Sequence, residues 1–276
     1  MVALTLAAHA AELPAAVEVR KSNGAGGDIV SVGTVLDSAG LLVTVSAAAE
    51  PGARFFVGPA DQPAKGDVAL HEPKSRVLLL RTEKPAAPAA TLGTSRALAP
   101  LAELKWSAGA GLKPARVVGP MKSLDGKALL LTLLRVNFAE GTPVPGTPLL
   151  DPEHRVVALA LSALDDEAGG WLALPVEAVQ KVAADFAKYG RVQTGRLEIG
   201  VAIGTTTPRI ELVKPGQRGE KAGLRAGDVL LRLGTRDVAD CFDVLDANFH
   251  LDSRVETPIR ILRGQQIIDL TAPADE

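Results

Sequence analysis

Aromatic side chains are scarce in this sequence, and their scarcity restricts how a core can be built. Phe, Trp and Tyr together make up 3% of the 276 residues, although 47% of the residues are hydrophobic. The core must therefore consist mainly of Val, Leu, Ile and Ala. A chain of this length is expected to form two domains, each with its own core.

Cysteine, histidine and excess charge are also lacking, and these absences exclude several kinds of function. The single cysteine, Cys241, rules out an internal disulfide and a cysteine-based zinc site, and the 4 histidines are scattered. The 30 basic and 32 acidic residues are well mixed and give a net charge of -2, which would attract neither nucleic acid nor an anionic membrane. We therefore expect no metal ion, no cofactor and no nucleic-acid partner.

Long apolar runs are missing as well, with one short exception at the N-terminus. No run reaches the ~18 residues that a membrane-spanning helix needs, so no membrane span is expected. The short run Val2–Ala8 is followed by Ala8-His9-Ala10, which fits a small-x-small cleavage site. Residues 1–10 are therefore predicted to be the remnant of a secretory signal peptide, and the protein to be exported to the periplasm. The alternative is a disordered N-terminus without a targeting role.

Short predicted strands separated by turns dominate the sequence from Val17 to Val182. Ile29–Leu36 and Leu41–Ala47 are apolar and flank the turn Asp37–Gly40, which predicts a hairpin. Pro85–Ala90 (PAAPAA) indicates a linker between two halves. Many short strands favour barrels or a sandwich, and a helix over Val176–Lys188 is predicted to close this region.

The segment Leu212–Leu231 (LVKPGQRGEKAGLRAGDVLL) carries the strongest motif in the sequence. Gly216 and Gly227 suit turns, and Asp228 suits a cap at the entry to a strand. The segment resembles the pattern V-x-P-G-S-P-A-x-x-A-G-L-x-x-G-D-V-I of bacterial-type PDZ domains. This resemblance implies a PDZ domain, β-rich with short helices, over residues 191–274.

PDZ domains bind an extended peptide or a protein C-terminus as an added strand, and backbone N–H groups hold the terminal carboxylate. The resemblance assigns the carboxylate-binding loop to four consecutive residues and the opposite wall to the helix Asp240–Phe249. These groove residues are Glu198, Ile199, Gly200 and Val201 in the loop, and Phe242, Leu245 and Phe249 in the helix. The alternative is that these apolar residues form only the core.

The region before the PDZ motif resembles the trypsin-like double barrel of the HtrA/Deg family of PDZ serine proteases. Val32–Thr44 is similar to the family's G-S-G-x-x-x-x-x-x-G-x-I-L-T, and Leu172–Val176 to its F-A-I-P motif. Pro148–Asp151 and Val156–Leu159 are similar to the strand pair after the active serine. The resemblance implies a mostly β fold, with a trypsin-like double β-barrel over residues 14–190 and the PDZ domain behind it.

The family's catalytic residues are missing at all three positions. Ala47 replaces the histidine of T-N-A-H-V, Arg76 the aspartate of D-L-A, and Pro145 the serine of G-N-S-G-G-P. The two oxyanion donors would be the N–H groups of Pro145 and Pro143, and proline has none. The resemblance therefore implies a degenerate protease and not an enzyme.

Other side chains could replace the triad, and they keep a second hypothesis open. The candidates are Ser46, Thr142, Thr147, His71, His154 and Cys241. We expect His71 and His154 in surface turns and Cys241 as a small buried thiol.

The sequence predicts an inactive HtrA-like protein that binds peptides or protein C-termini and acts as an adaptor or scaffold in the cell envelope. An active HtrA-type protease is a candidate partner. The alternatives are a hydrolase that uses non-matching residues and a purely structural envelope protein.

Overall fold

The structure is a computed structural model that describes residues 16–22, 29–46, 53–59, 61–107, 111–165, 169–202 and 205–275. Two predictions concern residues outside these ranges, namely the signal-peptide remnant at residues 1–10 and the triad position Ala47.

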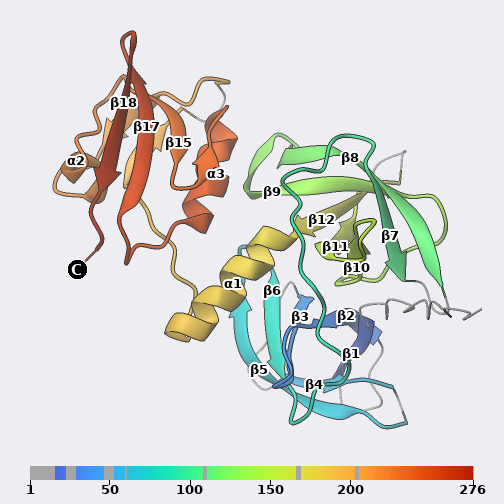
Figure 1. The fold of residues 1–276 in the computed structure, drawn as a ribbon. Coiled ribbons are helices and arrows are strands. Elements are labelled where there is room, and N and C mark those ends of the chain that lie inside the picture. Colours follow the sequence, from blue (N-terminus) through green and yellow to red (C-terminus); the bar gives the residue numbers. More distant parts are fainter. Residues whose placement is uncertain are drawn as a thin grey trace, which may run out of the picture.

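The N-terminal part of the chain forms a closed β-barrel with the strand order β1-β2-β3-β6-β5-β4 (Figure 1). Its interior is filled by aliphatic side chains, among which Leu42, Leu78 and Leu80 are 0% exposed. The strands have these bounds: β1 (Ala16–Ser22), β2 (Ile29–Val35), β3 (Leu41–Val45), β4 (Arg54–Val57), β5 (Ala64–Glu72) and β6 (Val77–Arg81).

A second closed barrel follows, with the strand order β10-β11-β12-β9-β8-β7. Its interior contains Leu104, Val136 and Val157, together with Trp106 near one end. The strands have these bounds: β7 (Glu103–Ser107), β8 (Leu112–Leu124), β9 (Lys127–Phe138), β10 (Pro148–Leu150), β11 (Val156–Ala163) and β12 (Trp171–Pro175). The prediction of a mostly β chain with two barrels is confirmed.

A third apolar cluster joins the two barrels. All residues of β3 are buried, yet only Leu42 of this strand belongs to the barrel interior. Leu41, Val43 and Val45 point the other way, into a cluster that also contains residues of β11 and β12. Side chains of a strand alternate between its faces, so a strand buried on both faces has a continuous apolar sequence. The run Leu41–Val45 has this pattern because it lies between the barrel interior and the second barrel.

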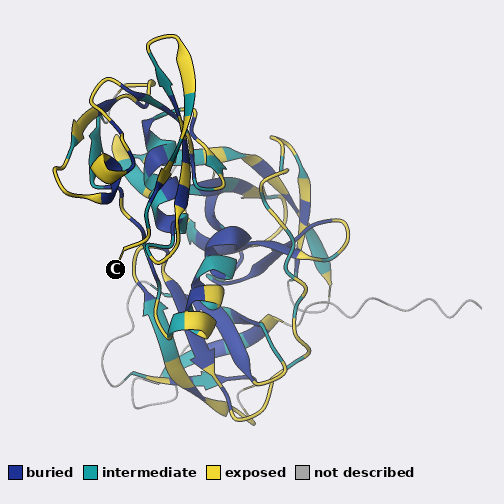
Figure 2. Cartoon of the chain, turned by 60° about the vertical axis from the view of Figure 1, so that its left-hand side comes forward, coloured by how far each residue is buried: buried dark blue, intermediate teal, exposed yellow. Residues whose placement is uncertain are grey.

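Helix α1 (Val176–Tyr189) covers this shared cluster with its first turns, and Figure 2 shows its residues becoming more exposed toward its end. It ends at Gly190, which has a left-handed backbone. Its start is anchored by buried Glu177, whose carboxylate accepts hydrogen bonds from Thr94 and Ser95 at 2.6–2.8 Å. Burial acts to raise the pKa of Glu177, but the hydrogen bonds outweigh burial and hold this pKa below its usual value.

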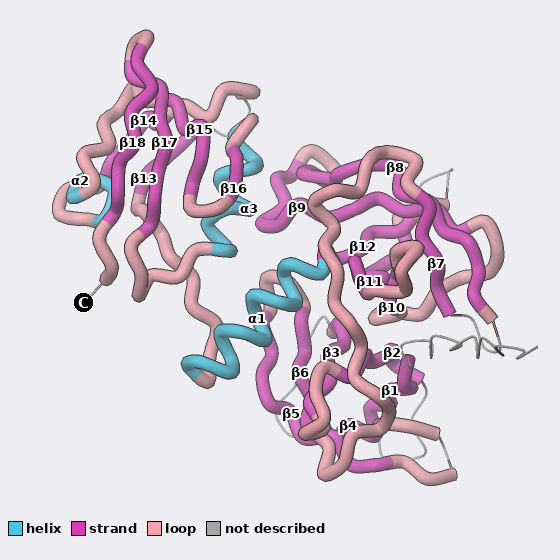
Figure 3. Tube along the Cα trace, in the orientation of Figure 1, coloured by secondary structure: helices cyan, strands magenta, loops and turns pink. Residues whose placement is uncertain are grey.

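The C-terminal unit is built from two small sheets and two helices (Figure 3). Strands β16-β15-β17-β18 form one sheet and β13-β14 the other. A separate aliphatic core, which includes Leu230, Val244 and Ile261, lies inside the unit. The bounds are β13 (Ile199–Val201), β14 (Ile210–Val213), α2 (Arg218–Lys221), β15 (Val229–Leu233), β16 (Arg236–Asp237), α3 (Cys241–His250), β17 (Thr257–Arg263) and β18 (Gln266–Ala272). Within the described residues, no helix combines the length and apolarity needed to cross a bilayer.

The C-terminal unit is docked on the second barrel through α3, which lies against the hairpin of β8 and β9 (Figure 1). At the start of α3, the ammonium of Lys122 lies 2.8 Å from a carboxylate oxygen of Asp240 and 2.6 Å from one of Asp243. One turn further on, Asp246 accepts a hydrogen bond of 2.9 Å from the N–H of Thr132. The Lys122 and Thr132 contacts both connect α3 to the second barrel and fix its position there.

Asp246 also pairs with Arg236 inside the C-terminal unit, at 2.6 Å. The two side chains are 9% and 19% exposed, and burial raises the pKa of Asp246 and lowers that of Arg236. Burial therefore disfavours both charged forms. A buried charge without its partner would destabilise the fold more than the intact ion pair does.

We predict that Asp246→Ala lowers the free energy of unfolding by about 3 kcal/mol, because it leaves buried Arg236 unpaired and the N–H of Thr132 without its acceptor. Asp237→Ala is the matched control, since Asp237 pairs with Arg232 but is 80% exposed, and we expect a loss below about 1 kcal/mol. Urea unfolding followed by circular dichroism measures both. Equal losses would contradict the assignment of Asp246 as the buried docking residue.

Candidate functional site

Arg76, predicted at the position of the catalytic acid, lies directly before β6 and next to the end of β3. The N–H of Ser46 donates to the carbonyl of Arg76 at 2.8 Å, which brings the two strand ends together. Arg76 has a left-handed backbone (φ 61°), and its side chain is exposed. Ser46 is the last described residue before the predicted histidine position, Ala47.

Pro145, predicted at the nucleophile position, lies in a turn of the second barrel that contacts the first. The carbonyl of Pro145 accepts a hydrogen bond of 2.8 Å from the N–H of Val32 on β2. A Cβ atom added to Gly146 would lie 2.8 Å from the hydroxyl oxygen of Thr44 on β3. Thr44 and Ser46 are roughly 7 Å apart along an extended strand. The structure therefore brings Pro145 and Arg76 to the same junction between the barrels.

The turn around Pro145 is closed on itself. The N–H of Thr147 donates to the carbonyl of Val144 at 3.0 Å, with Pro145 and Gly146 between them. Gly146 has φ 88°, and proline followed by a glycine of positive φ is typical of a type II β-turn. The hydroxyl of Thr147 adds a second bond of 2.6 Å to the carbonyl of Val144. The sequence Val-Pro-Gly-Thr thus favours a compact turn.

Every backbone N–H within residues 143–147 is already engaged. Val144 donates to the hydroxyl of Thr147 at 3.2 Å, and Gly146 donates to the carbonyl of Ala160 at 2.7 Å. Thr147 donates within the turn, and the two prolines have no N–H to offer. An oxyanion hole needs donors aimed at the reacting oxygen. This segment has no such donor.

Aromatic rings lie close to the same loop. The rings of Trp106 and Phe138 meet edge to face with centroids 5.4 Å apart, and Phe138 meets Trp171 at 6.0 Å. A Cβ atom added to Gly141 would lie 3.7 Å from the Trp106 ring. Edge-to-face contacts of this kind stabilise packed rings. The start of the loop therefore rests against aromatic side chains.

His71 is not in a surface turn, and this prediction was wrong. It lies on β5, is half-buried, and has its Nε2 atom 3.2 Å from the carbonyl oxygen of Ser46. Because β5 extends to Glu72, the histidine falls on the strand and next to Ser46 at the end of β3. Period-two alternation continued past Leu70 would have found it.

The remaining candidates have other roles. His154 lies in the turn between β10 and β11, as predicted, with φ 60°. Cys241 is buried, as predicted, and its thiol donates to the carbonyl of Thr207 at 3.3 Å. The Thr147 hydroxyl is used by its own turn.

The predicted peptide-binding loop, Glu198–Val201, includes the short strand β13. Among the described residues, β14 is the only strand that pairs with β13. The carbonyl of Glu198 accepts from the N–H of Lys214 on the β14 side at 3.0 Å. Hydrogen-bonding direction alternates along an antiparallel strand, so the N–H and C=O of Ile199 point to the opposite edge. This edge can accept another strand.

Charged and apolar side chains surround this edge. The Glu198 carboxylate lies 2.5 Å from the ammonium of Lys214, which holds the pKa of Glu198 below its usual value. Ile199 and Val201 are half-buried and pack against the core of the C-terminal unit. A side chain at Gly200 would meet Leu212 at 3.4 Å, on the other face of the strand.

The three residues of the predicted helical wall differ in exposure. Phe242 and Leu245 are half-buried on α3. Phe249 is only 4% exposed and belongs to the apolar cluster of the barrels and α1, although it also lines a surface cavity together with Leu245. Docking of α3 on the barrels therefore covers most of the Phe249 ring.

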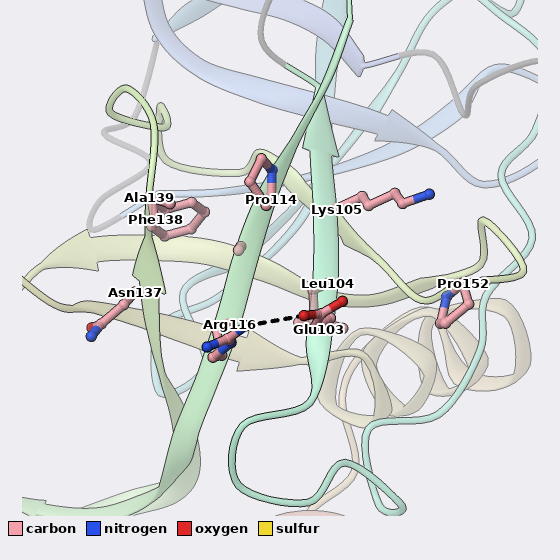
Figure 4. Close-up of a pocket in the computed structure, with 10 residues that line it drawn as sticks. Glu103, Leu104, Lys105, Pro114, Arg116, Asn137, Phe138, Ala139 and Pro152 are labelled. Carbon is pink, nitrogen blue, oxygen red and sulfur yellow. Dashed lines mark hydrogen bonds and ion pairs between the residues drawn. The ribbon is translucent and has the colours of Figure 1, made fainter.

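A cavity of about 710 Å³ lies on the surface of the second barrel. Figure 4 shows that Arg116 points toward Glu103, with which it pairs at 3.0 Å, while Phe138 and Pro152 lie on opposite sides. None of the residues that line it belongs to the predicted site. Its polar lining consists of this surface ion pair, Lys105 and Asn137, which by themselves indicate no chemistry.

Comparison with known proteins supports the fold, although no protein-family model matches the chain. The HtrA-type protease AlgW solved with a tripeptide is 18% identical, with a TM-score of 0.67 over 95% of this chain and 93% of that one. AlgW solved with a decapeptide is 18% identical, with a TM-score of 0.63 over 90% and 82%. The serine endoprotease from Yersinia pestis is 15% identical, with a TM-score of 0.61 over 95% and 93%. The chain therefore has the fold of the HtrA-type proteases, and the predicted trypsin-like fold class is confirmed.

The turn at Pro145 generates a stability prediction. A Cβ atom at Gly146 would lie 2.0 Å from the carbonyl oxygen of Val32, whereas one at Gly126, also of positive φ, would meet nothing within 4 Å. Gly126→Ala should cost about 1 kcal/mol from backbone strain alone. Gly146→Ala should cost about 2–4 kcal/mol, because overpacking adds to this strain. Urea unfolding of both variants tests this, and equal costs would show that the turn is not held against β2.

Proposed function

We propose that this protein is a catalytically inactive HtrA-like protein whose residues 191–274 act as a PDZ domain. In this proposal it binds extended peptides or protein C-termini and serves as an adaptor or scaffold in the cell envelope. Export to the periplasm and partnership with an active HtrA-type protease are parts of the same proposal.

The observation that carries the loss of catalysis is the closed turn at Val144–Thr147. Peptide hydrolysis by a trypsin-like site needs a nucleophile, a base and oxyanion donors. Pro145 offers no hydroxyl, and every N–H of residues 143–147 is either absent or engaged within the fold. Arg76 adds a cation where the site would need an anion to orient its base. Substituting one residue would restore none of the other groups.

Peptide binding is supported by the edge of β13 that no described strand covers. An added strand would bond to the outward N–H and C=O of Ile199, and its side chains would contact α3. AlgW was solved with a tripeptide and with a decapeptide, which supports peptides as the ligand class for the shared fold.

A hydrolase that uses non-matching residues is the second candidate, and His71 is the observation that favours it. His71 lies beside Ser46, whose N–H bonds to the carbonyl of Arg76. Its Nε2 atom, however, contacts a backbone carbonyl, which requires this nitrogen to act as the donor. The proposal of an inactive protein is therefore favoured.

We predict that the full chain does not cleave unfolded casein and is not labelled by a fluorophosphonate probe, because Pro145 at the nucleophile position has no hydroxyl and residues 143–147 have no free N–H for an oxyanion. An active HtrA-type protease serves as the positive control. Labelling that His71→Ala abolishes would instead establish the hydrolase. His154→Ala is the matched control, since His154 lies in a turn.

We predict that the full chain binds members of a library of C-terminal octapeptides, as measured by fluorescence anisotropy. Amidation of the terminal carboxylate should weaken binding about tenfold or more, because it removes a charge-assisted hydrogen bond. N-methylation of alternate ligand residues should weaken binding only at positions that pair with β13. A library without binders, or binders indifferent to both changes, would leave the structural alternative as the better account.

A further inference from the structure

A cavity of about 240 Å³ lies where the segment between β6 and β7, the second barrel and the C-terminal unit meet. The segment contributes Arg96, β9 contributes Leu131, β16 contributes Arg236, and α3 contributes Asp246 and His250. None of the residues predicted for the peptide groove lines this cavity. It is therefore separate from the edge of β13.

The guanidinium of Arg96 has no carboxylate of its own. Arg96 is exposed, and no acid among the described residues lies within ion-pair distance of it. Glu177, which also lines the cavity, already accepts hydrogen bonds from Thr94 and Ser95 at 2.6–2.8 Å. An anion that enters the cavity can therefore pair with Arg96 without displacing an existing ion pair.

Arg236 carries a second unused donor. One of its terminal nitrogens binds Asp246 at 2.6 Å, and the other lies 2.6 Å from Nε2 of His250. The Nε atom of Arg236, in contrast, is buried and has no hydrogen-bond partner among the described residues. A buried donor without an acceptor is unfavourable unless a ligand or water supplies one.

The charges that act on His250 are positive. Arginine can only donate, so the contact with Arg236 makes Nε2 of His250 an acceptor and leaves the ring neutral. Burial lowers the pKa of His250 to about 2, and the charges of Arg236, Arg96 and Lys181 act in the same direction. The surroundings of this ring therefore favour an anion in the cavity over a cation.

The remaining walls of the cavity are mostly apolar. They are formed by Leu98, Pro120, Leu131, Leu134, Pro175 and Ala178. An apolar cavity of ~150 Å³ is large enough to hold a benzene ring. The space here therefore admits one ring-sized apolar group together with a carboxylate.

We propose that this cavity binds a small monocarboxylate with an apolar body about the size of one ring. The carboxylate would accept hydrogen bonds from the guanidinium of Arg96 and from the Nε–H of Arg236, and the apolar body would contact Leu98 and Leu131. One negative charge matches the one guanidinium that lacks a carboxylate. The inference goes beyond the proposed function, because this site uses neither the edge of β13 nor the Pro145 turn.

The test titrates the isotope-labelled full chain with benzoate and follows the Nε–H signal of Arg236 and the backbone N–H signal of Thr132 by NMR. Benzoate should shift both signals. Benzamide, its neutral isostere, should bind about tenfold more weakly, because it lacks the charge that strengthens the hydrogen bonds. Inorganic phosphate should bind more weakly than benzoate, because it has no apolar body, and equal binding would overturn the assignment of a monocarboxylate.

Arg96 supplies the variants that test the charge. Arg96→Met should weaken benzoate binding about tenfold, and Arg96→Lys about threefold, since lysine keeps the charge but loses the planar fork. Arg54→Met is the matched control and should leave binding unchanged. Arg54 is an exposed arginine of β4 that lines none of the described cavities. Both arginines are exposed, so all three variants should fold like the original chain, as circular dichroism would show.

The outcomes separate this inference from the proposed function. The cavity is overturned as a site if benzoate shifts no signal up to its solubility limit, or if Arg96→Met and Arg54→Met bind it alike. If benzoate binds but no octapeptide does, the site stands and the proposal of a PDZ domain fails. If an octapeptide displaces benzoate, the two ligands share one site and the separate cavity is overturned.

Discussion

The arrangement of the molecule depends on one apolar cluster shared by the two barrels and α1. Strands β3 and β6 are buried on both faces, with Leu42 and Leu80 inside the first barrel and Val43 and Leu79 between the barrels. Burial of aliphatic surface is the dominant favourable term in folding. The side chains that the barrels contribute to this cluster are all aliphatic. The cluster fixes the relative position of the barrels, and with it the junction at which the strand ends and the Pro145 turn meet.

At that junction, the turn preserves contact between the barrels, and no N–H of residues 143–147 is left unengaged. The carbonyl of Pro145 bonds to Val32, and Gly146 approaches β2 so closely that only glycine fits. Proline stabilises this turn by restricting the unfolded chain, and glycine stabilises it by adopting a positive φ without strain. Because this turn connects the two barrels, we interpret it as a structural element and not as part of a hydrolytic site.

The C-terminal unit is positioned mainly by polar contacts. Lys122 binds two carboxylates at the start of α3, and Asp246 is shared between a backbone N–H of β9 and Arg236. Such contacts require specific geometry, and the buried charges at Asp246 and Arg236 are tolerated only as a pair. Because α3 is also the proposed wall of the peptide groove, the docking surface and the proposed binding surface use the same helix.

Sequence patterns alone determined the strand-rich class and the helix after Pro175, because periodicity and turn chemistry are local properties. Local properties could not reveal that β5 extends to Glu72 and carries His71 beside Ser46. Nor could they show that Phe249 is buried by the barrels while Leu130 and Lys74 meet α3 at a cavity. These facts depend on which surfaces the docked units bury, and burial between distant segments is decided only when the whole chain has folded.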